Sequence, residues 1–166
     1  TGMGAAGYTM PLPDNDEMFN TKNKMLEDIT TLLGGRVAEE IIFGDITTGA
    51  SNDIKRATET ARSMVMKYGM SEKIGLIAYG NDDDEVFIGR DLAHTRGYSE
   101  EVAREIDGEI SRIIRECHEN AESIIRENIG VLNSCAALLL EKEKIHREEF
   151  EALFTTEKEE VAKTNE

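Results

Sequence analysis

The strongest constraint on the fold of this 166-residue chain is a long run of apolar residues at helical spacing in its second half. From Ser99 to about Asn128 an apolar residue returns every three or four positions, which places one stripe along a single α-helix. Ser99 suits the N-cap because its hydroxyl can accept a backbone N–H bond. The stripe consists of Val102, Ile106, Ile110, Ile113, Cys117, Ala121 and Ile124. This pattern predicts a mainly α fold of the helical-bundle type.

A first long helix is predicted from about residue 16 or 20 to residue 42, again from spacings of three and four. Its apolar stripe consists of Met25, Ile29, Leu32, Leu33 and Val37. Its opposite side carries Thr31, Gly35, Ala38 and Ile42, and small residues at this spacing let another backbone come close. We therefore expect the helix to be enclosed on both sides. Alternatively, the Gly34-Gly35 pair breaks it into two helices.

The remaining elements are shorter. A loop over residues 44–50 leads to a helix over 52–68, with Gly69 at its C′ position. The proline-terminated run 4–10 predicts a short edge strand, and the β-prone runs 76–79 and 86–88 predict a small hairpin. Helices are expected over 131–144 and 148–154. We predict one domain over residues 1–154 and a disordered acidic tail over 155–166, where apolar periodicity is missing.

Charge and composition exclude some functions. The net charge is -15, whereas nucleic-acid binding requires a basic surface that displaces counterions. No apolar run approaches the roughly 20 residues needed to span a bilayer, so no membrane contact is expected from this chain itself. Cys117 and Cys135 fall on apolar helix faces, which suits buried thiols in a reducing compartment.

Few residues are candidates for chemistry. The three histidines, His94, His118 and His146, are too far apart in the sequence for a local zinc pair, and the segment from His118 has Glu122 where H-E-x-x-H requires histidine. No G-x-x-x-x-G-K-[ST] motif is present, so the chain has no phosphate-binding P-loop.

Two carboxylates remain. Asp53 follows a glycine turn at a helix start, where a purely structural role in the helix dipole, with Ser51 or Asn52 as cap, is the simplest interpretation. Glu39 flanks the apolar stripe beside Leu32 and Phe43, where a solvated glutamate is not expected. Its alternative is an exposed edge residue that reaches water.

Five sequence blocks follow one another along the chain: G-G-R-V-A-E-E-I-I-F-G at 34–44, T-G-A-S-N-D-I-K-R-A-T at 48–58, M-V-M-K-Y-G-M-S at 64–71, E-V-F-I-G-R at 85–90 and A-R-E-I-D at 103–107. Together they resemble the peptidase domain of the FtsH family of ATP-dependent zinc metalloproteases. The resemblance covers roughly residues 4–154 without large gaps. It implies that Asp53 is the third zinc ligand and that Glu39 hydrogen-bonds a ligand histidine. It also implies that substrate extends along the edge strand at Gly7, Tyr8 and Thr9.

The resemblance implies a zinc metalloendopeptidase that degrades unfolded or membrane proteins, membrane-anchored and homo-hexameric when whole. Its peptidase domain would lie on the cytoplasmic side, most simply of a bacterial inner membrane. The chain lacks the H-E-x-x-H helix, so two histidine ligands and the general base are expected upstream of Thr1, and the chain alone is expected to be inactive. ATP and Mg²⁺ would act only through an ATPase module outside it. The small-residue side of the first helix would be the seat of the missing helix, and therefore exposed or filled by a neighbouring molecule. The alternative is a non-catalytic helical assembly or interaction module.

Overall fold

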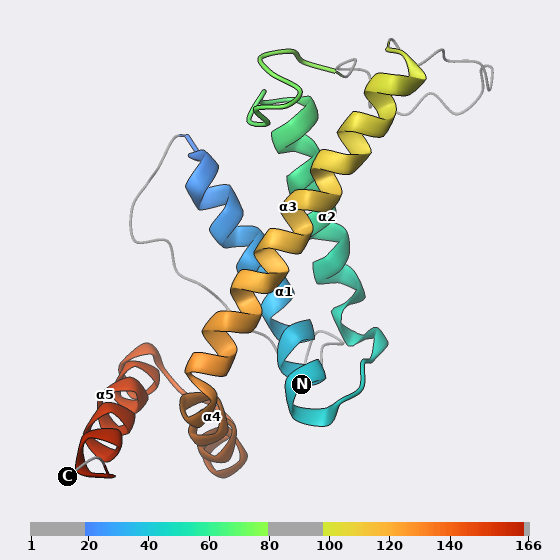
Figure 1. Ribbon diagram of the computed structural model, residues 1–166. Coiled ribbons are helices and arrows are strands. Elements are labelled where there is room, and N and C mark those ends of the chain that lie inside the picture. Colours follow the sequence, from blue (N-terminus) through green and yellow to red (C-terminus); the bar gives the residue numbers. More distant parts are fainter. Residues whose placement is uncertain (1–18, 80–97, 165–166) are drawn as a thin grey trace.

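The structure is a computed structural model that describes residues 19–79 and 98–164, with side chains described as far as residue 155. Its elements are α1 (Lys22–Phe43), the short 3₁₀ helix η1 (Thr48–Ala50), α2 (Ser51–Met66), α3 (Glu100–Glu127), α4 (Ile129–Lys142) and α5 (Arg147–Thr164). Figure 1 shows α3 crossing α1 and α2, while α4 and α5 lie beyond its C-terminal end. The predicted mainly α architecture is confirmed.

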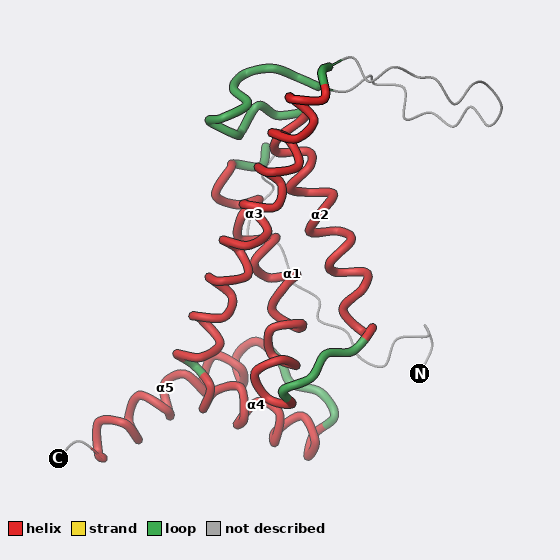
Figure 2. Tube along the Cα trace, turned by 45° about the vertical axis from the view of Figure 1, so that its right-hand side comes forward, coloured by secondary structure: helices red, strands yellow, loops and turns green. Residues whose placement is uncertain are grey.

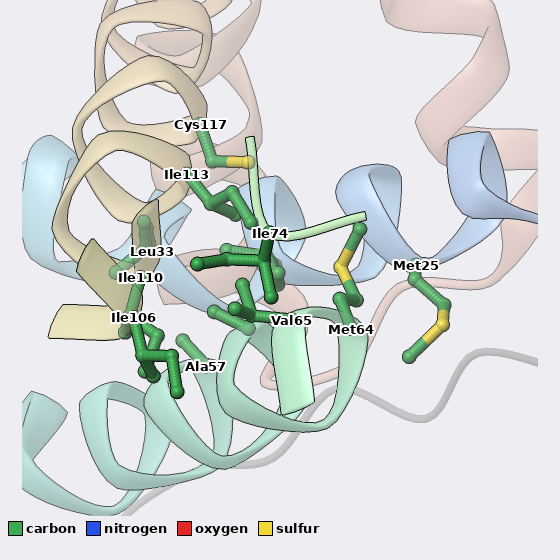
Figure 3. Packing of buried hydrophobic residues seen from close by; sticks show 12 residues of the cluster. Met25, Leu33, Ala57, Met64, Val65, Ile74, Ile106, Ile110, Ile113 and Cys117 are labelled. Carbon is green, nitrogen blue, oxygen red and sulfur yellow. The ribbon is translucent and has the colours of Figure 1, made fainter. Parts of the chain in front are cut away.

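A body of three helices holds the core. α1, α2 and α3 each pack against the other two, and the view in Figure 2 shows the same arrangement. Figure 3 shows apolar side chains from all three helices, together with Ile74 from the loop after α2, converging on one cluster. Ile29, Met64 and Ile106 are among its largest fully buried side chains. Each such side chain stabilises the fold by about 1.5–3 kcal/mol relative to full exposure.

The stripe predicted for α3 closely matches the buried face. Ser99 is its N-cap and accepts a bond from the backbone N–H of Val102 at 3.3 Å. Ile106, Ile110, Ile113, Cys117 and Ala121 are buried as predicted, whereas Ile124 is 49% exposed because it lies past the end of the three-helix body. Glu109, which the stripe did not include, is also buried.

α1 is one continuous helix through Gly34 and Gly35, and its stripe is buried from Met25 to Val37. Its opposite side, however, carries no covering element among the described residues. Thr31, Gly35 and Ile42 are exposed, and a Cβ added at Gly34 or Gly35 would have no neighbour within 4 Å. The described residues therefore cover only one of the two sides on which α1 was expected to be enclosed. The expectation that the small-residue side lies exposed agrees with the structure.

The predicted β elements require correction, because the described residues contain no strand. Residues 76–79 form a loop that folds back on α2, where the N–H of Tyr79 donates to the carbonyl of Met66 at 2.7 Å. Burial of Ile74 and the edge-to-face contact of Tyr79 with Tyr98 (5.3 Å between ring centroids) hold this loop in place. These tertiary contacts outweigh a β-prone composition. The other half of the predicted hairpin and the predicted edge strand with Gly7, Tyr8 and Thr9 lie outside the described residues.

Among the described helices, α4 and α5 are joined to the body by contacts between α3 and α4. Asn128 interrupts the helix there, and α3 and α4 are bent by 76°. α4 begins at Ile129, two residues before the start expected at residue 131. α5 continues to Thr164, beyond the end expected at residue 154. Within the described ranges no single helix has the length and apolar character of a membrane span, and only the bent pair α3 and α4 passes such a test jointly.

Candidate metal centre

Asp53 lies in the first turn of α2, where backbone N–H groups have no helical partner and favour a negative charge. Its side chain is 43% exposed, and its recorded ion pair is a distant one, 4.0 Å from Oδ1 to Nη1 of Arg56. A carboxylate with this exposure and so weak a pairing keeps oxygen lone pairs available for a ligand. The geometry therefore allows Asp53 to donate to a metal, as well as to stabilise the helix start.

The start of α2 is not capped as predicted. α2 begins at Ser51, and its N-cap residue, Ala50, makes no side-chain hydrogen bond. The cap lies one element earlier, where the Thr47 hydroxyl accepts a bond from the N–H of Gly49 at 3.1 Å and begins η1. Since η1 runs directly into α2, Thr47 caps a continuous turn that ends at Asp53.

Glu39 is connected to this turn. It is half-buried on α1, and its Oε1 and Oε2 accept bonds from the Thr47 hydroxyl (2.9 Å) and the Thr47 N–H (3.3 Å). Arg36, also on α1, donates from Nη1 to the Thr47 carbonyl at 3.0 Å. The structure thus joins α1 to the Asp53 loop through the unusual glutamate identified in the sequence.

Sequence reasoning missed Thr47 and the Arg36 contact. A signal was present in Thr47-Thr48-Gly49, because a threonine two positions before a glycine turn can bond the backbone N–H there. Ser51 and Asn52 are equally good capping residues nearer the helix, so the local sequence does not single out Thr47.

The described part of the chain brings no three His, Cys, Asp or Glu residues into a group that could hold a metal ion. His118 lies on α3 facing α1, with Nε2 3.8 Å from Oε2 of Glu40, and His146 is exposed just before α5. Neither joins Asp53. His94 lies outside the described residues. Among the described residues Asp53 thus stands without the further ligands that a catalytic zinc site, with three ligands from protein, requires.

A second polar cluster lies at the opposite end of the body. Glu109 of α3 is only 6% exposed and accepts bonds from the Ser71 hydroxyl (2.5 Å) and from Nε and Nη2 of Arg112 (3.0 and 3.1 Å). The Arg112 hydrogen bond lowers the pKa of Glu109, burial opposes this, and the Ser71 bond lowers the pKa further. Arg112, also bonded to Glu116, has a raised pKa.

Beside this cluster lies a cleft of about 300 Å³ lined by Lys22, Glu72, Lys73, Glu109 and Arg112. Its charges of opposite sign largely satisfy one another, since Arg112 bonds two glutamates and Lys73 lies 4.0 Å from Glu105. The cluster is explained by the attachment of the loop after α2 to α3. It holds no arrangement of groups suited to catalysis.

Comparison with known proteins agrees with the sequence blocks. The profile of Peptidase family M41 matches residues 1–153. The ATP-dependent zinc metalloprotease FtsH 1 of Thermoanaerobacter sp. (strain X514) is 55% identical over 92% of the chain and 25% of that protein. The ATP-dependent zinc metalloproteases FtsH of Caldicellulosiruptor bescii and Thermotoga maritima are 55% and 47% identical, over 90% and 96% of the chain and 24% and 26% of each protein. The chain thus spans about a quarter of the length of these curated relatives.

Proposed function

The chain belongs to peptidase family M41, and we propose that it is the C-terminal part of the proteolytic domain of an ATP-dependent zinc metalloendopeptidase. Its relatives are named as ATP-dependent zinc metalloproteases, and the match extends over almost all of the chain. The observation that supports a role in a metal site is the presentation of Asp53. Its carboxylate is accessible, weakly paired and carried on a helix start that α1 holds through Glu39.

In this proposal Asp53 supplies one of three protein ligands, and two histidines come from a part of the intact protein outside this chain. Zinc, when bound, polarises the scissile carbonyl and lowers the pKa of its water to about 7. The negative charge that would bind zinc does not destabilise α2, because a carboxylate is favoured at the N-terminus of a helix. The general base also belongs to the outside segment.

Glu39 would accept a hydrogen bond from a ligand histidine and so fix its tautomer and ring orientation. Both of its oxygens already accept from Thr47. Each carboxylate oxygen has two lone pairs, so Glu39 retains acceptor capacity for an imidazole N–H. One carboxylate would then connect the histidine ligands to the loop that carries Asp53.

The remaining properties are proposed for the whole protein. Polypeptides, unfolded or membrane-embedded, are its substrates, and ATP acts through a separate module, since this sequence has no P-loop. The intact enzyme is a homo-hexamer anchored in a bacterial inner membrane, with the peptidase domain on the cytoplasmic side.

The test is Asp53→Asn in the intact protease, with zinc per subunit and degradation of unfolded casein as the two measurements. Asparagine keeps the size of the side chain but removes the anionic oxygen that binds zinc. We expect loss of both zinc and casein degradation. Asp107→Asn, an exposed aspartate in α3, is the matched control and should change neither.

Full zinc content and full activity in Asp53→Asn would remove Asp53 from the site. An intact wild-type protein that binds no zinc and degrades no casein would instead favour the non-catalytic assembly module.

A further inference from the structure

Thr47, six positions before the proposed zinc ligand, has a hydrogen-bond partner at each of its polar atoms. The Thr47 N–H and hydroxyl donate to the two Glu39 oxygens, at 3.3 and 2.9 Å. The hydroxyl oxygen also accepts from the N–H of Gly49 at 3.1 Å, and the carbonyl oxygen accepts from Arg36 at 3.0 Å. We call Arg36, Glu39, Thr47 and Gly49 the Thr47 cluster.

We infer that Thr47 is a positioning residue for Asp53: it fixes the direction in which η1 enters α2, and thereby the placement of the Asp53 carboxylate. This inference rests on the proposed zinc site. It adds to that site a residue that would act through Asp53 and not by contact with metal or substrate.

The start of α2 depends on this cluster because it has no side-chain cap of its own. Ala50, the N-cap residue, is buried, but it can offer only apolar contact. Three hydrogen bonds join α1 side chains to the segment 45–52, and all three involve Thr47. If η1 rotated, Asp53 would move with it. The hydrogen bonds of Thr47 to α1 oppose this rotation.

The backbone at Gly49 also packs closely against Thr47 and Glu39, which further restrains η1. A Cβ at Gly49 would lie 3.2 Å from the Thr47 hydroxyl and 3.7 Å from Oε1 of Glu39. The backbone of η1 thus lies directly against the side chains of Thr47 and Glu39.

Thr47 is exposed, so the cluster is not part of the apolar core. Two α1 residues with charged side chains converge on a surface threonine, in a place where the core gains no burial from them. This arrangement is better explained by orientation of the following helix than by overall stability.

The central variant is Thr47→Val, which keeps the shape and removes the hydroxyl that both donates to Glu39 and accepts from Gly49. Thr47→Ser restores that hydroxyl. Thr60→Val is the matched control, since its hydroxyl donates only within α2, to the carbonyl of Arg56 at 3.0 Å. Each variant is made in the intact protease, and its zinc Kd is measured by competition with a chelator beside a thermal melt.

We expect Thr47→Val to weaken zinc binding about tenfold, in the range seen when residues that support metal ligands are changed. Thr47→Ser should return to within about twofold of the wild type. The melting temperature should fall modestly in Thr47→Val, because a capping hydroxyl is lost, and Thr47→Ser should restore it. In the 166-residue chain, the Gly49 amide should exchange faster in Thr47→Val and not in Thr60→Val.

An unchanged zinc Kd in Thr47→Val, while Asp53→Asn loses zinc, would overturn the inference and leave the proposed function intact. Equal weakening in Thr60→Val would also overturn it, since the effect would then be a general property of α2. A wild-type intact protein without zinc would overturn both proposals.

Discussion

Glu109 is the residue whose environment departs most from what its chemistry prefers. It is a buried carboxylate in the middle of an apolar stripe, and it is tolerated because Ser71 and Arg112 satisfy both of its oxygens. The Ser71 bond joins residues 38 positions apart in the sequence and attaches the loop after α2 to α3. These hydrogen bonds therefore hold the loop after α2 against α3, at an interface that is otherwise apolar.

Replacement of Glu109 by glutamine should lower the free energy of unfolding by about 1.5–3 kcal/mol near neutral pH, because charge-assisted bonds to Arg112 are lost. The folded-state pKa of Glu109 is lowered, so its ionised form stabilises the fold above the unfolded-state pKa. That contribution disappears as the pH falls through the folded-state pKa. Urea unfolding of both proteins across this range should show the difference shrinking in acid.

Glu119→Gln, an exposed change on the same helix, is the control and should alter stability little at any of these pH values. A Glu109→Gln deficit that persists unchanged in acid would mean that the side chain acts through packing and not through its charge.

At the scale of elements, α1 shows two sides with different functions. Its stripe is buried against α2 and α3, while its small-residue side is bare in the described structure. Glycine in an exposed helix interior costs roughly 1 kcal/mol relative to alanine, and here no contact offsets that cost.

Gly34→Ala and Gly35→Ala should therefore each raise the free energy of unfolding of the 166-residue chain by about 0.5–1 kcal/mol. Gly108→Ala, at an equally open position in α3, should give a similar increase. Chemical denaturation of the three variants checks this. A destabilised Gly35→Ala beside a stabilised Gly108→Ala would reveal a partner on this side of α1 that the described residues do not contain.

The helices with periodic apolar residues were predictable from the sequence, whereas the hydrogen bonds and packing contacts between elements were not. Ser99 and the α3 stripe follow from local rules, because caps and amphipathic periodicity are properties of neighbouring residues. The loop at 76–79 was wrongly predicted as a strand, because its conformation is set by Met66 and Ile74 contacts that local composition does not encode.

The candidate site divides in the same way. Glu39 was singled out by its odd placement beside an apolar stripe, whereas the proposed roles of Asp53 and Glu39 in a zinc site were implied only by the family resemblance. Thr47, which connects them, was missed, because its role depends on the distance between α1 and η1 and not on its neighbours in sequence.

As a whole, the molecule consists of a three-helix body and an α4–α5 pair attached at one end. Most buried side chains lie in the body, whereas α4 buries only Val131. Leu140 of α4 is 87% exposed.

This asymmetry predicts uneven stability. Amide hydrogen exchange in the 166-residue chain should show the slowest exchange in α1, α2 and α3, near the global unfolding free energy, and faster exchange in α4 and α5 by local opening. Peptide-level mass spectrometry resolves the two regions. Equal protection throughout would mean that the C-terminal pair unfolds only with the body.

The contribution of α3 to the core also has a consequence for biosynthesis. Ile106, Ile110, Ile113 and Cys117 close a cluster whose other members lie mainly on α1 and α2. After Met66 leaves the ribosome, about 50 further residues, or roughly 3–10 s of translation, must pass before Cys117 follows. Throughout that interval the nascent chain exposes the apolar faces of α1 and α2, which α3 later covers, and it is therefore most prone to aggregation before α3 is complete.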